Sequence, residues 1–255
     1  MATHRNVQQS PNLQVDVPGQ TDTTAQAPIL TLQEEITACT RCPRLVEHCQ
    51  KVAAEKRRAY RDWDYWGKPV PGWGDPRAEV MVVGLAPGAH GANRTGRMFT
   101  GDSSGDFLYR ALWEAGFASQ PTSTDRQDGL TLRNLWISAA GRCAPPDNKP
   151  LPEELRNCFP FVEAEFQLLS RKRLLVALGK VAADTCLRLL QRQGALTTLS
   201  AYPFGHGVLH HFAEAPSLLC SYHPSQQNTS TKRLTAEMLR DIFALAASFT
   251  TPGSV

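Results

Sequence analysis

Apolar residues along this chain follow two patterns, short continuous runs and longer stretches with helical spacing. The short runs are rich in Val, Leu and Ile and predict strands buried on both faces of a sheet. They cover residues 80–83, 134–140, 174–178 and 218–221. Helical spacing between and after them predicts helices beginning near Phe107, Pro152, Lys180 and Lys232. Strands alternating with helices predict an α/β fold, a three-layer α/β/α sandwich around a four-stranded parallel sheet.

The segments outside this alternation divide into a tail, two more helical stretches and a hairpin. Residues 1–28 are polar and show no periodicity, so we expect a disordered tail there and a single domain over residues 29–255. Helical spacing returns at Leu32, Ile36 and Leu45, and a second helical stretch is expected over residues 45–61. Residues 202–212 are expected to form an irregular hairpin.

Composition narrows the class of protein. An apolar fraction of 42% and a charged fraction of 20% in 255 residues are ordinary for one globular domain. A net charge of +3 permits a polyanionic partner without establishing one. We see neither a bilayer-length apolar run nor a secretory signal pattern, so we expect a cytoplasmic protein without a membrane partner.

The stretch over residues 79–105 is the one around which the chain is organised. The first predicted strand leads into a loop with six glycines, and an amphipathic helix follows. In doubly wound sheets, ligands bind at the carboxyl ends of the strands. His223 directly follows the last predicted strand, so we expect it at the same edge, where an imidazole can donate a hydrogen bond to a ligand. The loop lacks both common nucleotide-binding glycine patterns, which ranks a nucleotide-binding enzyme low.

The seven cysteines are expected to have metal or redox roles, because nothing marks the chain for an oxidising compartment. Cys39 and Cys42 form a C-x-x-C pair, and Cys143 and Cys158 form a second, wider pair. Four thiolates in two pairs suit either zinc or an iron–sulfur cluster, and the residues alone do not choose between them. The remaining three cysteines fall in apolar patterns and are expected in the core: Cys49, Cys186 and Cys220.

Four motifs, taken with these cysteines, resemble a known family. The motifs are GLAPGAHG at 84–91, NRTGR at 93–97, FTGD at 99–102 and SYHPS at 221–225. They resemble the signature segments of the type 5 uracil-DNA glycosylases, in order and in spacing, and the resemblance covers roughly residues 36–249. It implies a monofunctional, monomeric DNA glycosylase that removes uracil, and also hypoxanthine or other deaminated bases. The cysteine set is similar to that family's 4Fe–4S site, with structural zinc as the alternative.

The resemblance implies roles for several residues at the loop. Asp102 matches the acid that positions or activates water, with Asp75 and Asp106 as weaker candidates. His223 stabilises the leaving base. Phe99, an aromatic residue in a polar loop, is the predicted stacking platform, and Asn148 contacts the base or the water. The backbone of the first motif completes the expected base-binding set, with Gly84, Leu85 and Ala86.

Two positions depart from related glycosylases. Ala86 and Pro87 stand where other families carry a polar residue and cannot act as a base. Ala139 stands where others place a base-reading asparagine, which predicts a roomier and less selective pocket.

Polar residues around these motifs are expected to contact the phosphates of DNA or to fill the gap left by a flipped base. No lysine stands beside the motifs in a position suited to a Schiff base, so lyase activity is not expected. A non-catalytic iron–sulfur protein that binds or senses DNA is the alternative function. The expected DNA contacts are Arg94, Arg97, Ser225, Gln226, Gln227, Asn228 and Arg233.

Overall fold

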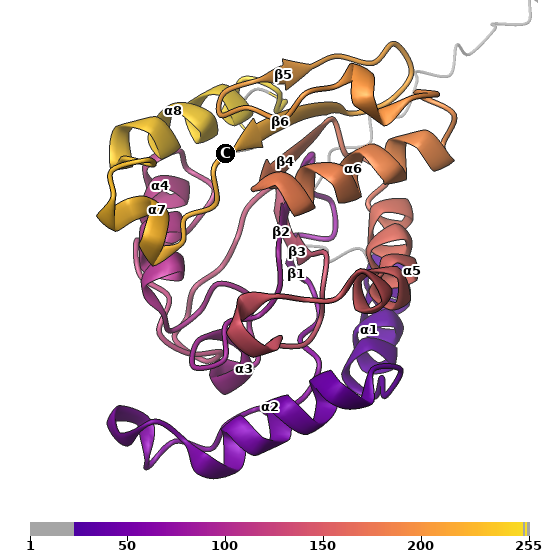
Figure 1. Ribbon diagram of the computed structural model, residues 1–255. Helices are drawn as coiled ribbons and strands as arrows, with labels where there is room; N and C mark the ends of the chain where they lie inside the picture. Colours follow the sequence, from indigo (N-terminus) through magenta and orange to yellow (C-terminus); the bar gives the residue numbers. More distant parts are fainter. Residues whose placement is uncertain (1–22, 252, 254–255) are drawn as a thin grey trace, which may run out of the picture.

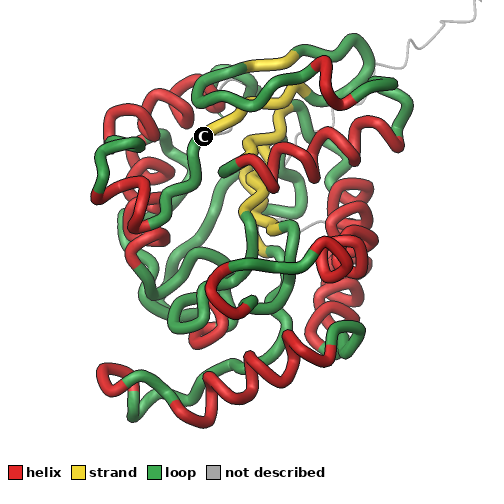
Figure 2. The backbone as a smooth tube through the Cα atoms, viewed as in Figure 1, coloured by secondary structure: helices red, strands yellow, loops and turns green. Residues whose placement is uncertain are grey.

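The central feature of the computed structural model, which describes residues 23–251 and 253, is a six-stranded sheet in the order β1-β3-β2-β4-β6-β5. Its four inner strands run parallel and its two edge strands antiparallel. The strands, yellow in Figure 2, are β1 (Trp73–Gly74), β2 (Val80–Gly84), β3 (Leu135–Ala139), β4 (Leu174–Leu178), β5 (Leu209–His210) and β6 (Ser217–Ser221).

The predicted parallel sheet is confirmed, and its four strands match the four apolar runs to within a residue at either end. The two edge strands were not predicted. Each is two residues long, too short to show a periodicity, and β5 lies inside the expected hairpin at 202–212. Each edge strand forms because it pairs antiparallel with an inner strand, and its own sequence carries no strand pattern.

Helices cover both faces of the sheet, which gives the predicted three layers (Figure 1). Helices α4 and α8 lie on one face, and α5 and α6 on the other. The helices are α1 (Thr23–Thr37), α2 (Pro43–Glu55), α3 (Ala92–Thr95), α4 (Ser103–Glu114), α5 (Pro152–Leu168), α6 (Lys180–Arg192), α7 (Gln226–Ser230) and α8 (Ala236–Ala247). Three short 3-10 turns are η1 (Arg58–Tyr60), η2 (Pro146–Asn148) and η3 (Leu199–Ala201).

The inner strands are apolar throughout because each of their faces enters a different core. In β2, Val80 and Val82 pack with the α4 and α8 side chains, whereas Met81 and Val83 pack with those of α5 and α6. All five residues of β2 are buried. A strand with both faces covered leaves no polar position, which is why the run reads as continuous rather than alternating.

Two predicted helices end or begin where the backbone enters the left-handed region. The stretch expected over residues 45–61 ends as α2 at Glu55, because Lys56 has a φ of 51°. The last helix was expected to begin at Lys232, but Lys232 has a φ of 58° and separates α7 from α8. Helix α8 instead starts after Thr235, whose hydroxyl accepts the N–H of Met238 as an N-cap.

At the N-terminus, α1 starts at Thr23, so the end of the expected tail at residue 28 is corrected to residue 22 at the latest. Residues 1–22 lie outside the described part of the chain, and so does the disorder expected there. Leu32 and Ile36 of α1 pack on Phe161 of α5, which joins the N-terminal segment to the sandwich. Across residues 23–251, no helix has the length and apolar character to cross a bilayer.

The amino edge of the sheet is fastened by Glu79, the residue before β2. Its carboxylate accepts hydrogen bonds from the Asn134 side chain (2.9 Å) and from the backbone N–H of Thr251 (2.7 Å). Burial by itself would raise the pKa of Glu79, but these hydrogen bonds and the charge of Arg171 together lower the pKa to about 2. The ionised carboxylate therefore ties the C-terminal segment to the start of β2 and β3.

We expect Glu79→Gln to lower the free energy of unfolding at pH 7 by roughly 1–3 kcal/mol, because buried donors lose their charged acceptor. The pKa of Glu79 is depressed in the folded protein, so its contribution is present above the ordinary value of 4.5 and lost as the pH falls towards 2. Urea unfolding at pH 7 and at pH 3 would show the difference between wild type and variant shrinking. Glu163→Gln, at a surface pair with Arg192, is the control and should change stability little.

Candidate active site

The parallel strands bring two of the motif-bearing segments together at one edge, the loop after β2 and the segment after β6. Gly84 at the end of β2 lies beside Ala139 of β3, and Ser221 at the end of β6 lies beside Leu178 of β4. The N–H of Gly141 also donates to the carbonyl of Leu85, which holds the loop after β3 against the first motif. Three loops therefore meet at the carboxyl edge.

Asp102 ends the glycine-rich loop and caps α4. Its Oδ1 accepts the N–H of Gly105 at 3.0 Å. Its Oδ2 faces two glycines: a Cβ on Gly88 would lie 2.7 Å from this oxygen, and one on Gly91 would overlap it. Burial raises the pKa of Asp102, against the lowering effect of the N–H groups of Gly105 and Ser104. The carboxylate is thus the N-cap of α4, held against bare backbone.

Phe99 and His223 meet at the same edge. Their ring centroids are 5.8 Å apart with an interplanar angle of 32°. Phe99 has a φ of 53°, and its ring lies over Gly84, where a Cβ would be 2.7 Å from Cζ. A half-buried aromatic ring held in a strained backbone and covering a glycine is suited to a planar ligand.

His223 is fixed by two neighbours. Gly179, which follows β4 with a φ of 97°, leaves room for it: a Cβ there would be 3.3 Å from the Cβ of His223. The side-chain amide of Asn228 donates to the His223 carbonyl at 2.8 Å. Burial lowers the pKa of His223 to about 4, so the imidazole is neutral at pH 7. A neutral ring carries one N–H and can donate a hydrogen bond without adding a full charge.

The other predicted base-binding residues lie along the loops after β2 and β3. Ala86 faces Gly141 across the two loops, and Ala139 is buried in β3 beside Gly84. Asn148 ends η2 with a φ of 56° and is exposed. No described contact joins its side chain to Phe99 or His223, so its role stays a prediction.

The weaker acidic candidates lie elsewhere. Asp75 accepts the N–H of Asn134 at the amino edge of the sheet, at the opposite end from the motifs. Asp106 is exposed in the first turn of α4. Asp102 is the acid that the fold places in the glycine-rich loop.

Arg94, expected on a phosphate, is an interior residue with 3% of its surface exposed. Its Nε donates to the His90 carbonyl at 2.8 Å and its Nη2 to the Gly101 carbonyl at 2.7 Å. The guanidinium also lies over the rings of Tyr60 and Trp63, at 3.9 and 4.0 Å. The phosphate contact predicted for Arg94 is therefore wrong, because this side chain clamps the two ends of the loop together.

Arg97 is corrected for the same reason. It is 5% exposed and forms a bidentate ion pair with Asp128, at 2.9 and 2.6 Å. Its remaining donors reach Thr100 and Ser123. Every arm of the guanidinium is used inside the protein, which leaves none for a phosphate. Sequence could not separate an arginine that binds a loop from one that binds a ligand.

The segment after His223 keeps some of its side chains free. Ser225 is the N-cap of α7, and the Asn228 amide holds the His223 carbonyl, so both have structural partners. Gln226 and Gln227 are exposed at the start of α7. Arg233 is exposed with its guanidinium 4.7 Å from the ring centroid of Tyr222. These last three remain suited to nucleic acid.

Two histidines that support the motifs were missed from the sequence. His206 Nδ1 accepts the N–H of Tyr222 at 3.3 Å, which orients the residue before His223. His90 Nδ1 lies 3.0 Å from the Tyr65 hydroxyl, at the turn of the glycine-rich loop. The two glycines that flank His206 were a signal of a functional turn that the sequence did offer. The contact of His90 with Tyr65 gave no such signal, because Tyr65 lies 25 residues away in the chain.

The two cysteine pairs come together. Cys39 and Cys42 lie at the junction of α1 and α2, Cys143 follows β3, and Cys158 lies in α5. All four line one cavity. Cys42 also accepts a hydrogen bond from the Asn157 amide at 3.4 Å.

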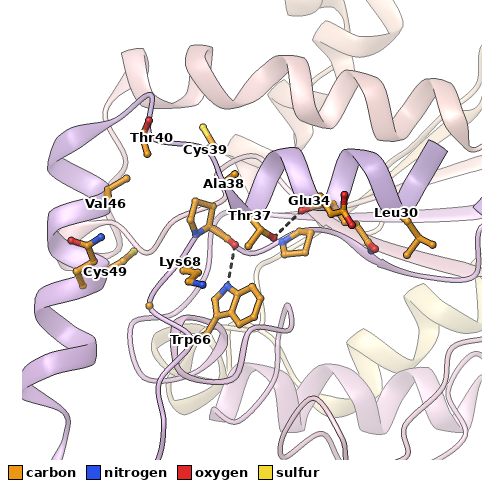
Figure 3. Close-up of a pocket in the computed structure, with 15 residues that line it drawn as sticks. Leu30, Glu34, Thr37, Ala38, Cys39, Thr40, Val46, Cys49, Trp66 and Lys68 are labelled. Atoms are coloured by element: carbon orange, nitrogen blue, oxygen red, sulfur yellow. Dashed lines mark hydrogen bonds between the residues drawn. The ribbon is translucent and has the colours of Figure 1, made fainter. Parts of the chain in front are cut away.

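A wider groove of about 660 Å³ runs beside this cavity, between α1, α2 and the connector at residues 66–71. Figure 3 shows it, with Cys39 at the turn between the two helices and Trp66 donating to the Pro69 carbonyl. Cys39 lines both the groove and the cysteine cavity. The groove therefore opens towards the cysteine set from outside the sheet.

The four cysteines could hold either of the two groups that the sequence left open, a zinc ion or an iron–sulfur cluster. Within residues 23–251, no three His, Cys, Asp or Glu side chains are arranged to hold a single metal ion. Zinc needs its four sulfurs about 2.3 Å from one point. Four thiols spaced around a shared cavity can instead hold a larger group, such as a cluster of several iron and sulfide ions. The four thiols around this cavity are therefore compatible with such a cluster.

Comparisons with known proteins agree with the motifs. A family model described as the uracil DNA glycosylase superfamily matches residues 71–246. A protein of Mycobacterium tuberculosis named type-5 uracil-DNA glycosylase is 50% identical over 216 residues, 84% of this chain and 79% of its own. A type-5 uracil-DNA glycosylase of Thermus thermophilus is 50% identical over 209 residues, 82% and 92% of the two chains. A type-4 uracil-DNA glycosylase of Pyrobaculum aerophilum is 29% identical over 150 residues, 58% and 64%.

We expect Gly91→Ala to displace the Asp102 carboxylate, since the new methyl group would overlap Oδ2. The N-cap of α4 then weakens, and the free energy of unfolding should fall by about 0.5–2 kcal/mol in urea titrations. Carboxyl-carbon NMR should show the raised pKa of Asp102 moving towards its ordinary value. Gly141→Ala is the matched control, because its methyl group would lie at an ordinary 3.4 Å from Ala86. An unchanged Asp102 titration in Gly91→Ala would contradict the packing described.

Proposed function

The chain belongs to the uracil DNA glycosylase superfamily, and we propose that it hydrolyses the N-glycosidic bond of uracil in DNA and leaves an abasic site. The observation that carries the proposal is the contact between the rings of Phe99 and His223 at the carboxyl edge, where Phe99 lies over Gly84. Similarity to named type-5 glycosylases over most of the chain supports it.

The site residues suit the charges that develop as the bond breaks. Positive charge builds on the deoxyribose and negative charge on the departing base. His223, neutral because burial lowers its pKa to about 4, can donate its N–H to an oxygen of the leaving uracil. Asp102, held against Gly88 and Gly91, accepts a proton from water or orients it, and its negative charge favours the sugar cation.

The base must leave the helix to reach these groups. Phe99 supplies the stacking face, and stacking on an aromatic ring is worth about 1–3 kcal/mol per base. Gln226, Gln227 and Arg233 are the exposed side chains suited to the strand around the extruded nucleotide. Asn148 contacts the base or the water from the loop after β3.

We propose a substrate range wider than uracil, including hypoxanthine. Ala139 and Gly84 lie side by side at the edge and offer no polar side chain to read a base. A pocket wall made of a methyl group and a hydrogen atom discriminates by shape alone, which separates similar bases only weakly. A panel of oligonucleotides with single lesions, assayed for base release, measures this range.

We further propose that Cys39, Cys42, Cys143 and Cys158 hold a structural 4Fe–4S cluster. Bound there, it would supply covalent cross-links between the α1–α2 junction and the segments that follow β3 and form α5. The chemistry of base removal passes through none of these residues. They line a cavity away from Phe99, His223 and Asp102.

We expect Asp102→Asn and His223→Ala each to slow single-turnover release of uracil by roughly 10²–10⁴-fold, because each removes a group that acts on the transition state. DNA affinity, measured by anisotropy, should change much less. Asp106→Asn, at an exposed position, and His210→Ala, in the edge strand β5, are the matched controls and should keep wild-type rates. Wild-type rates in both site variants would reject the assignment. Retained DNA binding with no base release from any lesion would favour the non-catalytic alternative.

We expect the wild-type rate to fall only in acid. Burial lowers the pKa of His223 to about 4, so the imidazole is neutral at pH 7 and becomes a cation only in acid. Burial also raises the pKa of Asp102 above its ordinary 3.8, so acid protonates this carboxylate as well. Single-turnover rates should therefore stay flat between about pH 6 and 8 and decline below about pH 5. An inflection near 6.5, the ordinary histidine value, would show that His223 is not the buried neutral group described.

We expect the purified full-length protein to be brown, with iron and sulfide in equal amounts. Cys39→Ala and Cys158→Ala should lose the colour, and the free energy of unfolding should fall as the cross-links disappear. Cys186→Ala, at a core cysteine outside the cavity, is the control that keeps the colour. Colourless wild-type protein with stoichiometric zinc would overturn the cluster.

A further inference from the structure

Arg142 is the most completely buried arginine beside the cysteines. It follows β3 directly, precedes Cys143 in the chain and is 1% exposed. One arm of its guanidinium, Nη2, donates to Glu165 at 2.8 Å and to Ser138 at 3.1 Å. Glu165 is 2% exposed and also accepts the N–H of Gly72. The ion pair is therefore sealed inside the protein.

The other two donor nitrogens of Arg142 have no partner. Nε and Nη1 are buried, and neither has a hydrogen-bond acceptor among the described residues. A buried donor without an acceptor costs about 1–3 kcal/mol, and more when it is charged. Among the described residues, Glu165 is the one acidic side chain in ion-pair contact with this guanidinium, and it contacts only Nη2. Two arms of a buried cation are left for a group that the protein chain does not supply.

The position of Arg142 indicates which group that is. Arg142 lines the same cavity as Cys39, Cys42, Cys143 and Cys158. Its backbone N–H already interacts with the thiol of Cys158. Thiolates and sulfides accept hydrogen bonds, and four thiolates around an iron–sulfur core leave a net negative charge that a nearby cation offsets.

We propose that Arg142 is a cluster-contacting residue, whose Nε and Nη1 donate hydrogen bonds to sulfur atoms of the group held by the four cysteines. The proposal rests on the 4Fe–4S cluster of the proposed function and adds to it a fifth side chain and a positive charge. Hydrogen bonds to cluster sulfurs and local charge set the reduction potential of such groups. Arg142 therefore raises the potential of the cluster and slows its loss, while Glu165 fixes the guanidinium in place.

The test is made on the full chain, with Arg142→Lys as the main variant because lysine keeps the charge next to Glu165 and removes the two unpartnered donors. We expect a more negative reduction potential in dithionite titrations. We also expect cluster loss to an iron chelator roughly 10-fold faster than in wild type, the usual effect of removing an outer partner. Arg142→Met should shift both measurements further in the same direction.

Two control variants separate a direct contact from a structural effect. Arg44→Gln removes a guanidinium near Cys42 whose donors already bind Glu154, and it should leave the potential unchanged. Glu165→Gln breaks the ion pair but keeps both free donors of Arg142. If Arg142 acted only through this pair, Glu165→Gln would speed cluster loss as much as Arg142→Lys, and that result would overturn the proposal.

The two levels of the proposal fail in different ways. Wild-type protein without iron and sulfide rejects the cluster and the role of Arg142 together. Wild-type protein with a cluster whose potential and rate of loss do not change in Arg142→Lys rejects the role of Arg142 alone. A negative shift in Arg142→Lys that is absent in Arg44→Gln and smaller in Glu165→Gln supports it.

Discussion

Parallel pairing of β2, β3, β4 and β6 is the constraint on which this structure depends. Because parallel strands end at a common edge, the loop after β2 and the segment after β6 must meet there, although more than a hundred residues separate them. Glycines then set how closely the loops approach. Gly84 lies under Phe99, Gly88 and Gly91 lie against Asp102, and Gly179 lies against His223. Side chains of larger size at these positions would separate the groups that the sheet brings together.

The same packing sets the charges of the site. Burial raises the pKa of Asp102 and lowers that of His223 to about 4, so the imidazole at this edge is neutral at pH 7. The two shifts have one physical cause, because burial disfavours the charged form of each group.

Buried arginines form a second framework beneath the loops. Arg94 joins the two ends of the glycine-rich loop, Arg97 joins it to Asp128, and Arg142 joins the end of β3 to Glu165 in α5. Guanidinium groups suit this task because they bind several acceptors in a fixed plane. Arg142 differs from Arg97 in leaving two donors unused, on the side where the cysteines from three separate segments gather.

The sequence by itself determined which segments form the inner strands and at which edge of the sheet the motif residues lie. Continuous apolar runs marked the four inner strands because both faces of each are covered, and the glycine-rich motif and His223 followed two of them. It could not supply β1 and β5, whose pairs of residues become strands only by lying next to β3 and β6. It also assigned Arg94 and Arg97 to DNA phosphates, because the sequence does not show whether an arginine next to a motif contacts a phosphate or a group inside the protein. Burial, and with it the neutral state of His223 and the unpaired donors of Arg142, depends on residues distant in the chain, and only the tertiary structure decided it.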